Sequence, residues 1–187
     1  MNSDSREKIL AAAKKAAQAR GYAGLNFRDV AADVSIRAAS LYHHFPTKAD
    51  LGAAVARRYW EDSAAHLEAV SAEEADPIRA LRRYPETFRR ALADENRMCL
   101  ASFMAAENDD LPEPVKKEVQ AFADVNVAWL RRTLVKAGVV KPKAGERRAR
   151  AIFAAVAGAQ LIARSRADVS IYDELIEGYR EAGLLPG

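Results

Sequence analysis

The sequence contains one cysteine, three histidines and no long apolar segment, and these shortages exclude several classes of protein. A single cysteine, Cys99, cannot form an internal disulfide, which is typical of a reducing compartment. The most apolar run, Ala151 to Ala163, is shorter than the roughly 20 residues that span a bilayer. The first residues include acidic side chains and paired lysines, where a signal peptide needs an unbroken apolar stretch. We therefore expect a cytoplasmic protein with no membrane partner.

Residues that carry catalysis or bind metals are also scarce. The histidines, His43, His44 and His66, are not paired with cysteine or carboxylates at metal-site spacing. No nucleophile elbow, phosphate-binding glycine loop or dinucleotide fingerprint is present. Acidic pairs such as Asp109 and Asp110 lie in loop-like stretches, where a solvated surface is the default. We expect no enzyme, no metal site and no cofactor.

The net charge of +3 is unevenly distributed. Residues 1–60 hold 10 Lys/Arg and 5 Asp/Glu, a difference of +5, whereas residues 61–187 hold 19 and 21, a difference of −2. A basic N-terminal third favours a polyanionic partner there, although such charge can also serve solubility alone. An architectural DNA-binding protein would be basic throughout, and a helical protein-interaction module is the remaining alternative.

Apolar residues recur at three- and four-residue spacing along nearly the whole chain, which predicts an all-α fold without a sheet. Three pairs have the spacing of a capping box: Asp4 with Glu7, Asn26 with Asp29, and Thr47 with Asp50. Helices are expected from Asp4 to Gly21, Phe27 to Val34, after Ile36 to about His44, Thr47 to Val70, from Pro77 with an interruption at Pro85, Met98 to Glu107, Val115 to Ala137, Glu146 to Ser165, and Ile171 to Ala182.

The second and third of these helices have the pattern of a helix-turn-helix. A small residue, Ser35, and an apolar plug, Ile36, fit the tight turn between them. Leu41 and Phe45 are spaced to anchor the later helix on the core. The outer face then carries Arg37, Ala38, Ser40, Tyr42 and His43. Such a face suits a DNA major groove, and the alternative is a plain helical hairpin with a Tyr/His surface.

The stretch NFRDVAADVSIRAASLYHHFPTKADL, Asn26 to Leu51, resembles the DNA-binding signature of the TetR family of bacterial transcriptional regulators. The resemblance implies an N-terminal three-helix DNA-binding domain over residues 1–50 and a helical ligand-binding and dimerisation domain over 51–187. The sequence departs from the family pattern at two positions: Ser35 stands where glycine is usual, and Arg37 stands where a small hydroxyl residue is usual. The implied DNA-binding residues are Asn26, Arg28, Arg37, Ala38, Ser40, Tyr42, His43, Thr47 and Lys48.

The resemblance also implies the partners. They are a palindromic double-stranded DNA operator, a second copy of the chain, and a small-molecule inducer that releases the repressor from DNA. Dimerisation in the family uses the last two long helices, whose stripes here carry Ile152, Val156, Ala159, Ile162, Ile171, Leu175 and Tyr179. The alternative is that both stripes complete the core of the monomer.

A ligand pocket is expected where aromatic side chains gather around a few polar groups. The candidates are Tyr59, Trp60, Phe88, Cys99, Phe103, Met104, Phe122, Asn126 and Trp129. Aromatic stripes at helical spacing are also typical of a core, and Asn126 could simply bond a neighbouring backbone. Cys99, close to Arg97, is a possible sensor of oxidants or electrophiles, and the alternative is a buried, inert thiol.

Overall fold

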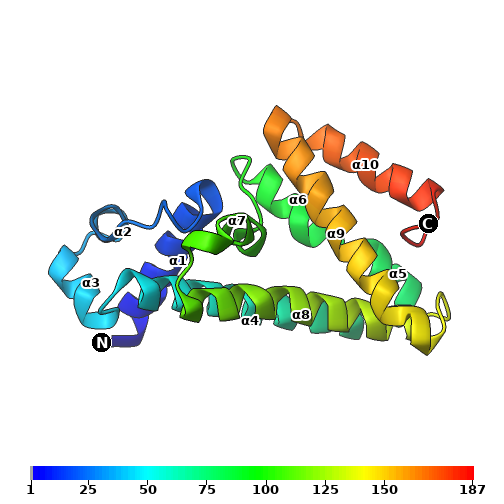
Figure 1. The fold of residues 1–187 in the computed structure, drawn as a ribbon, viewed down its shortest axis with the longest axis horizontal. Coiled ribbons are helices and arrows are strands. Elements are labelled where there is room, and N and C mark those ends of the chain that lie inside the picture. Colours follow the sequence, from blue (N-terminus) through cyan, green and yellow to red (C-terminus); the bar gives the residue numbers. More distant parts are fainter. Residues whose placement is uncertain (1) are drawn as a thin grey trace. The chain divides into compact units, whose positions relative to one another are not determined.

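The structure is a computed structural model and describes residues 2–187. Within these residues it contains ten α-helices, one short 3-10 helix and no strand, so the all-α prediction is confirmed (Figure 1). The elements are α1 (Asn2–Arg20), α2 (Phe27–Asp33), α3 (Ala38–His44), α4 (Lys48–Glu73), α5 (Pro77–Arg83), α6 (Glu86–Ala93), α7 (Leu100–Ala106), η1 (Asn108–Asp110), α8 (Glu113–Lys136), α9 (Pro142–Arg166) and α10 (Val169–Glu181).

Two of the three predicted capping boxes contribute to helix starts. Asn26 precedes α2, and its side-chain oxygen accepts hydrogen bonds from the N–H of Arg28 at 2.8 Å and of Asp29 at 3.4 Å. Thr47 and Asp50 bond reciprocally ahead of α4: each side chain accepts from the other residue's backbone N–H. Both arrangements satisfy N–H groups that a helix start leaves unpaired.

The third predicted cap is wrong. The helix α1 already includes Asp4, because it begins at Asn2, and the carboxylate of Asp4 instead pairs with Lys8 one turn later at 2.7 Å. Charges four residues apart meet on one face of a helix, so this pairing competes with the capping role.

The start of α9 also differs from the prediction, because the helix begins at Pro142 and not at Glu146. Proline suits the first position of a helix, where its missing N–H would have no partner. Gly145 then lies inside the helix and is buried. A Cβ there would come within 3.1 Å of Val135, so the glycine permits close approach of α8. The predicted start at Glu146 was too late because proline and glycine, which precede it here, are common in turns.

The first of two compact units comprises Met1–Glu61 and Leu100–Phe122. It holds α1, α2, α3 and α7 together with the first parts of α4 and α8. Its core is continuous and includes the fully buried residues Ile9, Leu41, Leu51, Leu100 and Met104. α7, although distant in sequence, packs against α1 within this unit.

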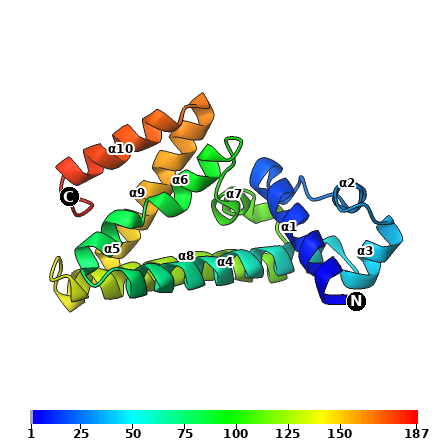
Figure 2. The same cartoon turned by 180° about the vertical axis from the view of Figure 1, so that it is seen from behind.

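The second unit comprises Asp62–Cys99 and Ala123–Gly187. In it α9 and α10 lie side by side, with α6 against both (Figures 1 and 2). Arg89 of α6 forms two hydrogen bonds to Asp173 of α10, at 2.7 and 2.8 Å. The buried hydroxyl of Tyr172 donates to the carbonyl of Pro85 at 2.7 Å. The division of function at residues 50 and 51 stays a prediction.

Among residues 2–187, no helix combines the length and the apolar character needed to cross a membrane.

Candidate nucleic-acid interface

The turn between α2 and α3 is built by a residue in a left-handed conformation. Ser35 has φ 56°, a region that residues other than glycine seldom adopt. The turn is closed by the N–H of Ile36, which donates to the carbonyl of Ala31 at 2.9 Å. Ile36 is half-buried against the core, as the helix-turn-helix pattern predicts. Arg37 precedes α3 without forming a side-chain cap.

The helix α3 is fixed to the core by two side chains. Leu41 is fully buried and Phe45 is 3% exposed, so the predicted anchors are confirmed. The guanidinium of Arg6 lies 5.3 Å from the centroid of the Phe45 ring, at cation–π distance. Helix α3 has only seven residues, so its position depends on these tertiary contacts more than on its own helical propensity.

The opposite face of α3 is open to solvent. Arg37, Ser40 and His43 are exposed, and Tyr42 is 55% exposed although it is a large aromatic residue. The Tyr42 ring packs against Phe27 of α2, with centroids 4.6 Å apart. Ala38 is only half-buried and packs partly on the core, so it is less accessible than the other four.

Beside α3 the surface forms a hollow of about 330 Å³, here called the α2–α4 hollow. Its walls combine apolar side chains with cationic and hydroxyl groups. They are Leu25, Asn26, Phe27, Arg28, Tyr42 and Lys48. Four of the residues predicted to bind DNA therefore lie together around one depression, although three come from three different helices and Asn26 from the turn before α2.

Three predicted residues have defined bonds within the chain. The side chains of Asn26 and Thr47 cap α2 and α4, as described above. Lys48 is half-buried, and its Nζ donates to the carbonyl of Ala23 at 3.1 Å and lies 4.6 Å from the centroid of the Tyr22 ring. An ammonium group has three N–H donors, so Lys48 keeps donors for a phosphate while its position is set by the turn before α2.

Comparison with known proteins shows which protein family has this helix-turn-helix. Residues 9–55 match the model described as "Bacterial regulatory proteins, tetR family". The solved TetR transcriptional regulator of Legionella pneumophila is similar over 97% of this chain and 99% of its own, with 28% identity and a TM-score of 0.90. The chain belongs to the TetR family. It is therefore a transcriptional regulator, and members of this family are DNA-binding proteins without enzymatic activity.

Two further TetR-like structures extend the comparison. The TetR family regulator of Agrobacterium tumefaciens shares 28% identity, covers 96% of this chain and 97% of its own, and has a TM-score of 0.87. The reduced form of E. coli NemR shares the fold at 20% identity and a TM-score of 0.81, covering 97% of each chain. A search of curated proteins found no match. In the described residues of this TetR family chain, no three His, Cys, Asp or Glu side chains gather as a metal site would require.

The residues predicted for a dimer interface fall into three groups. Ile152, Val156 and Ala159 have no accessible surface in the single chain and belong to the core of the second unit. Ile162 is 52% exposed, as is its neighbour Leu161, and both lie on α9. The α10 residues are half-buried: Ile171, Leu175 and Tyr179.

The predicted ligand residues are divided between the two units. In the first unit the Tyr59 ring stacks on Phe122 with centroids 5.2 Å apart, Met104 is fully buried and Phe103 is half-buried. The indole N–H of Trp60 donates to Glu118 at 2.8 Å. The hydrogen bonds from Arg57 lower the pKa of Glu118. Burial opposes this shift, and the hydrogen bond from Trp60 adds to it.

In the second unit a buried aromatic cluster surrounds Asn126. The Tyr84 hydroxyl donates to the Asn126 side-chain oxygen at 3.1 Å, and the Tyr84 ring stacks on Trp129 at 5.8 Å between centroids. Phe88 meets Tyr84 edge-on at 6.0 Å. Burial raises the pKa of Tyr84 well above its ordinary value of 10, so its hydroxyl stays a hydrogen-bond donor. Asn126 therefore has a side-chain hydrogen-bond partner, Tyr84, inside the buried aromatic cluster.

Cys99 is 1% exposed and lies beside a buried glutamine. Gln160 accepts a hydrogen bond from the backbone N–H of Cys99 at 2.9 Å and donates to the carbonyl of Phe88 at 2.7 Å. Arg97, predicted to favour a thiolate, instead pairs with the carboxylates of Asp94 and Glu95. This environment supports the structural interpretation of Cys99 over the sensor.

Sequence reasoning missed the residues that hold the turn before α2. Tyr22 and Ala23 each donate a backbone N–H to the carboxylate of Glu107, which follows α7 in the chain. The partners are separated by 85 and 84 residues. No local spacing pattern marks such a contact; the only signal was Gly21, which was identified as a helix stop.

Proposed function

We propose that this TetR family chain is a cytoplasmic repressor that binds a palindromic operator as a homodimer and is released by a small-molecule inducer. The observation that carries the DNA-binding part is the exposed face of α3 beside the α2–α4 hollow. That face combines a guanidinium, hydroxyls and an imidazole on a helix anchored from below by Leu41 and Phe45. Recognition helices of this type place their exposed side chains against base edges in the major groove.

The contacts divide into two kinds. Arg37, which directly precedes α3, and Ser40 of α3 are both exposed and are proposed to read base edges. Tyr42 and Lys48, at the α2–α4 hollow, are proposed to hold the phosphate backbone. Base contacts carry sequence preference, whereas phosphate contacts supply affinity for any duplex.

The test begins with the wild-type chain. Duplexes that bind this chain are selected from a random library. Fluorescence anisotropy then compares the affinity of the chain for the selected duplex with its affinity for a scrambled one, at low and near-physiological salt. Preference for the selected duplex at the higher salt supports a specific operator reader. Equal, weak binding to both duplexes that disappears with salt contradicts it, because only nonspecific phosphate contacts behave in that way.

Four alanine variants then separate the two kinds of contact. Tyr42→Ala and Lys48→Ala are expected to weaken binding to the operator and to the scrambled duplex alike. Lys48→Ala is also expected to reduce the salt slope, the slope of the logarithm of the binding constant against the logarithm of the salt concentration, by about 0.9 in magnitude. Arg37→Ala and Ser40→Ala are expected to cost about 1–3 kcal/mol on the operator only, and so to relax preference at single base pairs. Uniform losses for all four variants across a panel of operator variants would refute the assignment.

The dimer is proposed to form through the exposed side of α9 together with α10. Leu161 and Ile162 are exposed aliphatic residues, each 52% accessible, beside the small exposed residues Ala154 and Gly158. On α10 the half-buried residues Ile171, Leu175 and Tyr179 continue an apolar stripe. Small residues let helices from two copies approach closely, and apolar side chains at such a surface gain from being covered.

Ile162→Glu is expected to raise the dissociation constant of the dimer by about 100-fold, because a symmetric interface would bury two unpaired carboxylates. Sedimentation of the variant, compared with wild type at the same concentrations, measures this change. Ala69→Glu, which adds the same charge at an exposed position of α4, is the control and should leave the dimer intact. A dimer of unchanged strength in Ile162→Glu would place the interface elsewhere.

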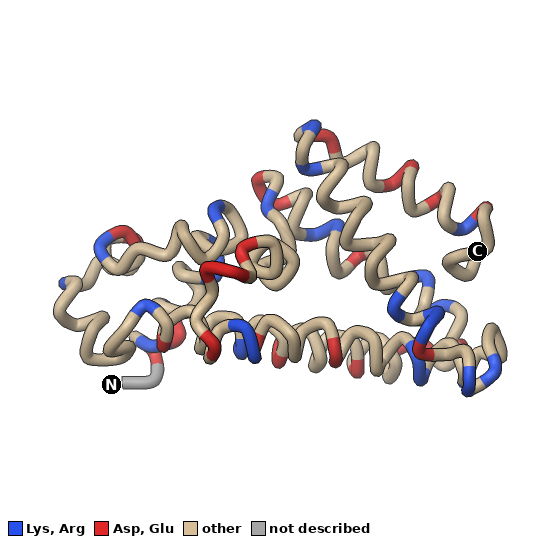
Figure 3. Tube along the Cα trace, viewed as in Figure 1, with Lys and Arg blue, Asp and Glu red and all other residues tan. Residues whose placement is uncertain are grey.

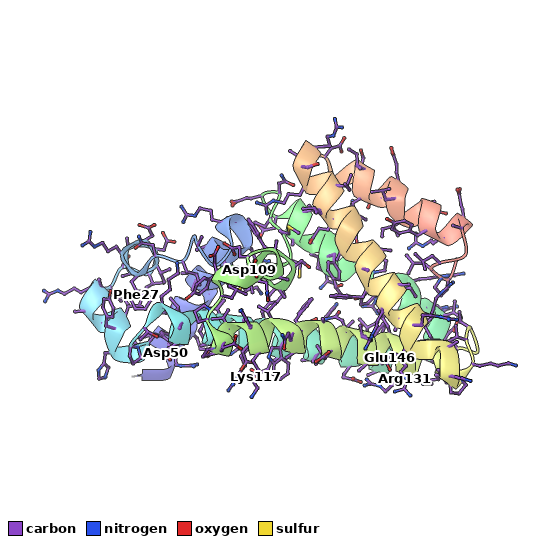
Figure 4. All side chains as sticks on the ribbon, viewed as in Figure 1. Phe27, Asp50, Asp109, Lys117, Arg131 and Glu146 are labelled. Carbon is purple, nitrogen blue, oxygen red and sulfur yellow. The ribbon has the colours of Figure 1, made fainter. Side chains whose placement is uncertain are left out.

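The inducer is proposed to act through the helices after α4. The second unit has an open hollow of about 440 Å³ between α8 and α9, with Val127 and Phe153 among its apolar walls. Arg131 of α8 and Glu146 of α9, both labelled in Figure 4, also line it. Phe153 meets Phe88 edge-on at 6.2 Å, which connects this hollow with the buried aromatic cluster. Aromatic walls with a few polar groups are typical of small-molecule sites. An inducer acts only through its different affinity for the DNA-bound and released states.

A further inference from the structure

We propose that Glu107 is a positioning residue for DNA binding. Its carboxylate holds the turn before α2 in place, and the residues of that turn hold Lys48 at the DNA-binding face. The inference rests on the proposed function and adds to it a residue outside the helix-turn-helix. All the groups involved belong to the first unit.

The first step is the pair of hydrogen bonds by which Glu107 holds the turn. One carboxylate oxygen accepts from the N–H of Tyr22 at 2.5 Å, and the other accepts from the N–H of Ala23 at 3.0 Å. Hydrogen bonds to an ionised acceptor are stronger than neutral ones, and two of them define a direction as well as a distance. Glu107 is half-buried, so water competes less for its oxygens than it does at an exposed site.

Gly21 leaves the space that these two hydrogen bonds need. Its φ is +69°, which glycine adopts without cost, and a Cβ at this position would lie 2.3 Å from a carboxylate oxygen of Glu107. The glycine therefore both ends α1 and leaves space for the carboxylate. Any side chain there would displace Glu107 from the two N–H groups.

The second step leads from the turn to Lys48. The carbonyl of Ala23 accepts a hydrogen bond from Lys48 Nζ at 3.1 Å, and the ring of Tyr22 lies 4.6 Å from the same nitrogen. Gly52, one turn further along α4, gives the ring its space, because a Cβ there would come within 2.7 Å of it. The residues that Glu107 holds by their N–H groups are thus the same two that position the lysine.

The third step concerns the lysine itself. Lys48 lines the α2–α4 hollow with Arg28 and Tyr42, where a phosphate is proposed to bind. A long, flexible side chain loses rotamer freedom on binding, and a lysine that is already oriented loses less. Glu107 therefore raises DNA affinity although it carries a negative charge, and a movement of α7 that withdrew it would lower that affinity.

The sign of this effect separates the proposal from simple electrostatics. Removing any carboxylate lessens repulsion from DNA and should tighten binding. Glu107→Gln is nevertheless expected to weaken binding to the selected operator by about 10-fold, because the isosteric carboxamide has one acceptor and turns an NH₂ toward the second N–H. Asp109→Asn is the matched control: this exposed residue lies in the same acidic segment, and its replacement should leave affinity unchanged or slightly increased (Figures 3 and 4).

A double-mutant cycle shows whether Glu107 acts through Lys48. In the Lys48→Ala background, Glu107→Gln should cause no further loss, and alone it should reduce the salt slope as Lys48→Ala does. A purely structural role for Glu107 would give the same loss in both backgrounds and would overturn the proposal. Tyr22→Leu tests the contact between the Tyr22 ring and Lys48. Its DNA affinity should fall as that of Lys48→Ala does, whereas Tyr22→Phe, which keeps the ring, should bind DNA like wild type.

The outcomes distinguish this inference from the proposed function. A wild-type chain without preference for any duplex overturns the operator proposal and the role of Glu107 with it. A wild-type chain that binds its operator, with Glu107→Gln equal to it or tighter, overturns the role of Glu107 alone. If Glu107→Gln fails to fold, as judged by circular dichroism, wild-type affinity in Tyr22→Leu overturns the inference.

Discussion

Leu41→Ala should lower the free energy of unfolding by about 3 kcal/mol, the scale of a buried leucine truncated in a packed core. Leu41 is the only buried residue of α3, and its accessible surface is zero. With that side chain removed, the seven-residue helix keeps the partly buried Ala38 and its C-terminal neighbour Phe45 as its contacts with the core. Operator binding should therefore be lost together with stability.

Chemical denaturation followed by circular dichroism measures the loss, and the adjacent residue supplies the control. Tyr42→Ala removes a larger side chain that is 55% exposed, so unfolding should change by less than about 1 kcal/mol while DNA affinity falls. The contrast between neighbours tests which face of α3 is inward. Equal stability losses in the two variants would mean that the orientation of α3 is wrong.

Trp129→Ala is expected to cost about 4 kcal/mol, within the usual range for a large aromatic residue removed from a core. Trp129 is 2% exposed, and its ring lies 18° from parallel to that of Tyr84. Its indole N–H donates to the hydroxyl of Ser71 at 2.9 Å. Truncation would open a cavity and leave part of the aromatic cluster without contacts.

The same denaturation experiment on Trp129→Phe separates packing from hydrogen bonding. Phenylalanine keeps a ring but cannot donate to Ser71, so a smaller loss of about 1–2 kcal/mol is expected. The pair also addresses the two interpretations of this residue, ligand wall or core. A side chain lining an open pocket has fewer contacts to lose, so a cost below about 1 kcal/mol for Trp129→Ala would favour the ligand wall.

Local patterns predicted the helix-turn-helix well because its requirements are local. A cap such as Asn26 acts on N–H groups two and three residues away, and the anchors Leu41 and Phe45 are one helical turn apart. The cap assigned to Asp4 failed under the same logic, since Lys8 is an equally local partner and pairs with it. Spacing alone does not decide between two nearby partners of one carboxylate.

The C-terminal helices were harder to interpret because one apolar stripe can serve two purposes. Ile152 and Ile162 belong to the same helix and are both aliphatic, yet the first has no exposed surface and the second is half exposed. Which of them is covered depends on the placement of α6 and α10, which the spacing of residues within α9 does not reveal. The aromatic candidates for a ligand pocket posed the same problem, and they lie in two separate compact units.

By itself the sequence determined the all-helical class, the turn at Ser35 and the family, because helical period, caps and turn residues act over a few positions. Only the tertiary structure decided where Lys48 lies and what Glu107 does. Their connection runs through Tyr22 and Ala23, which Glu107 reaches across more than 80 residues of chain. Contacts of that kind arise when helices pack, since packing brings together groups whose separation in sequence carries no periodic signal.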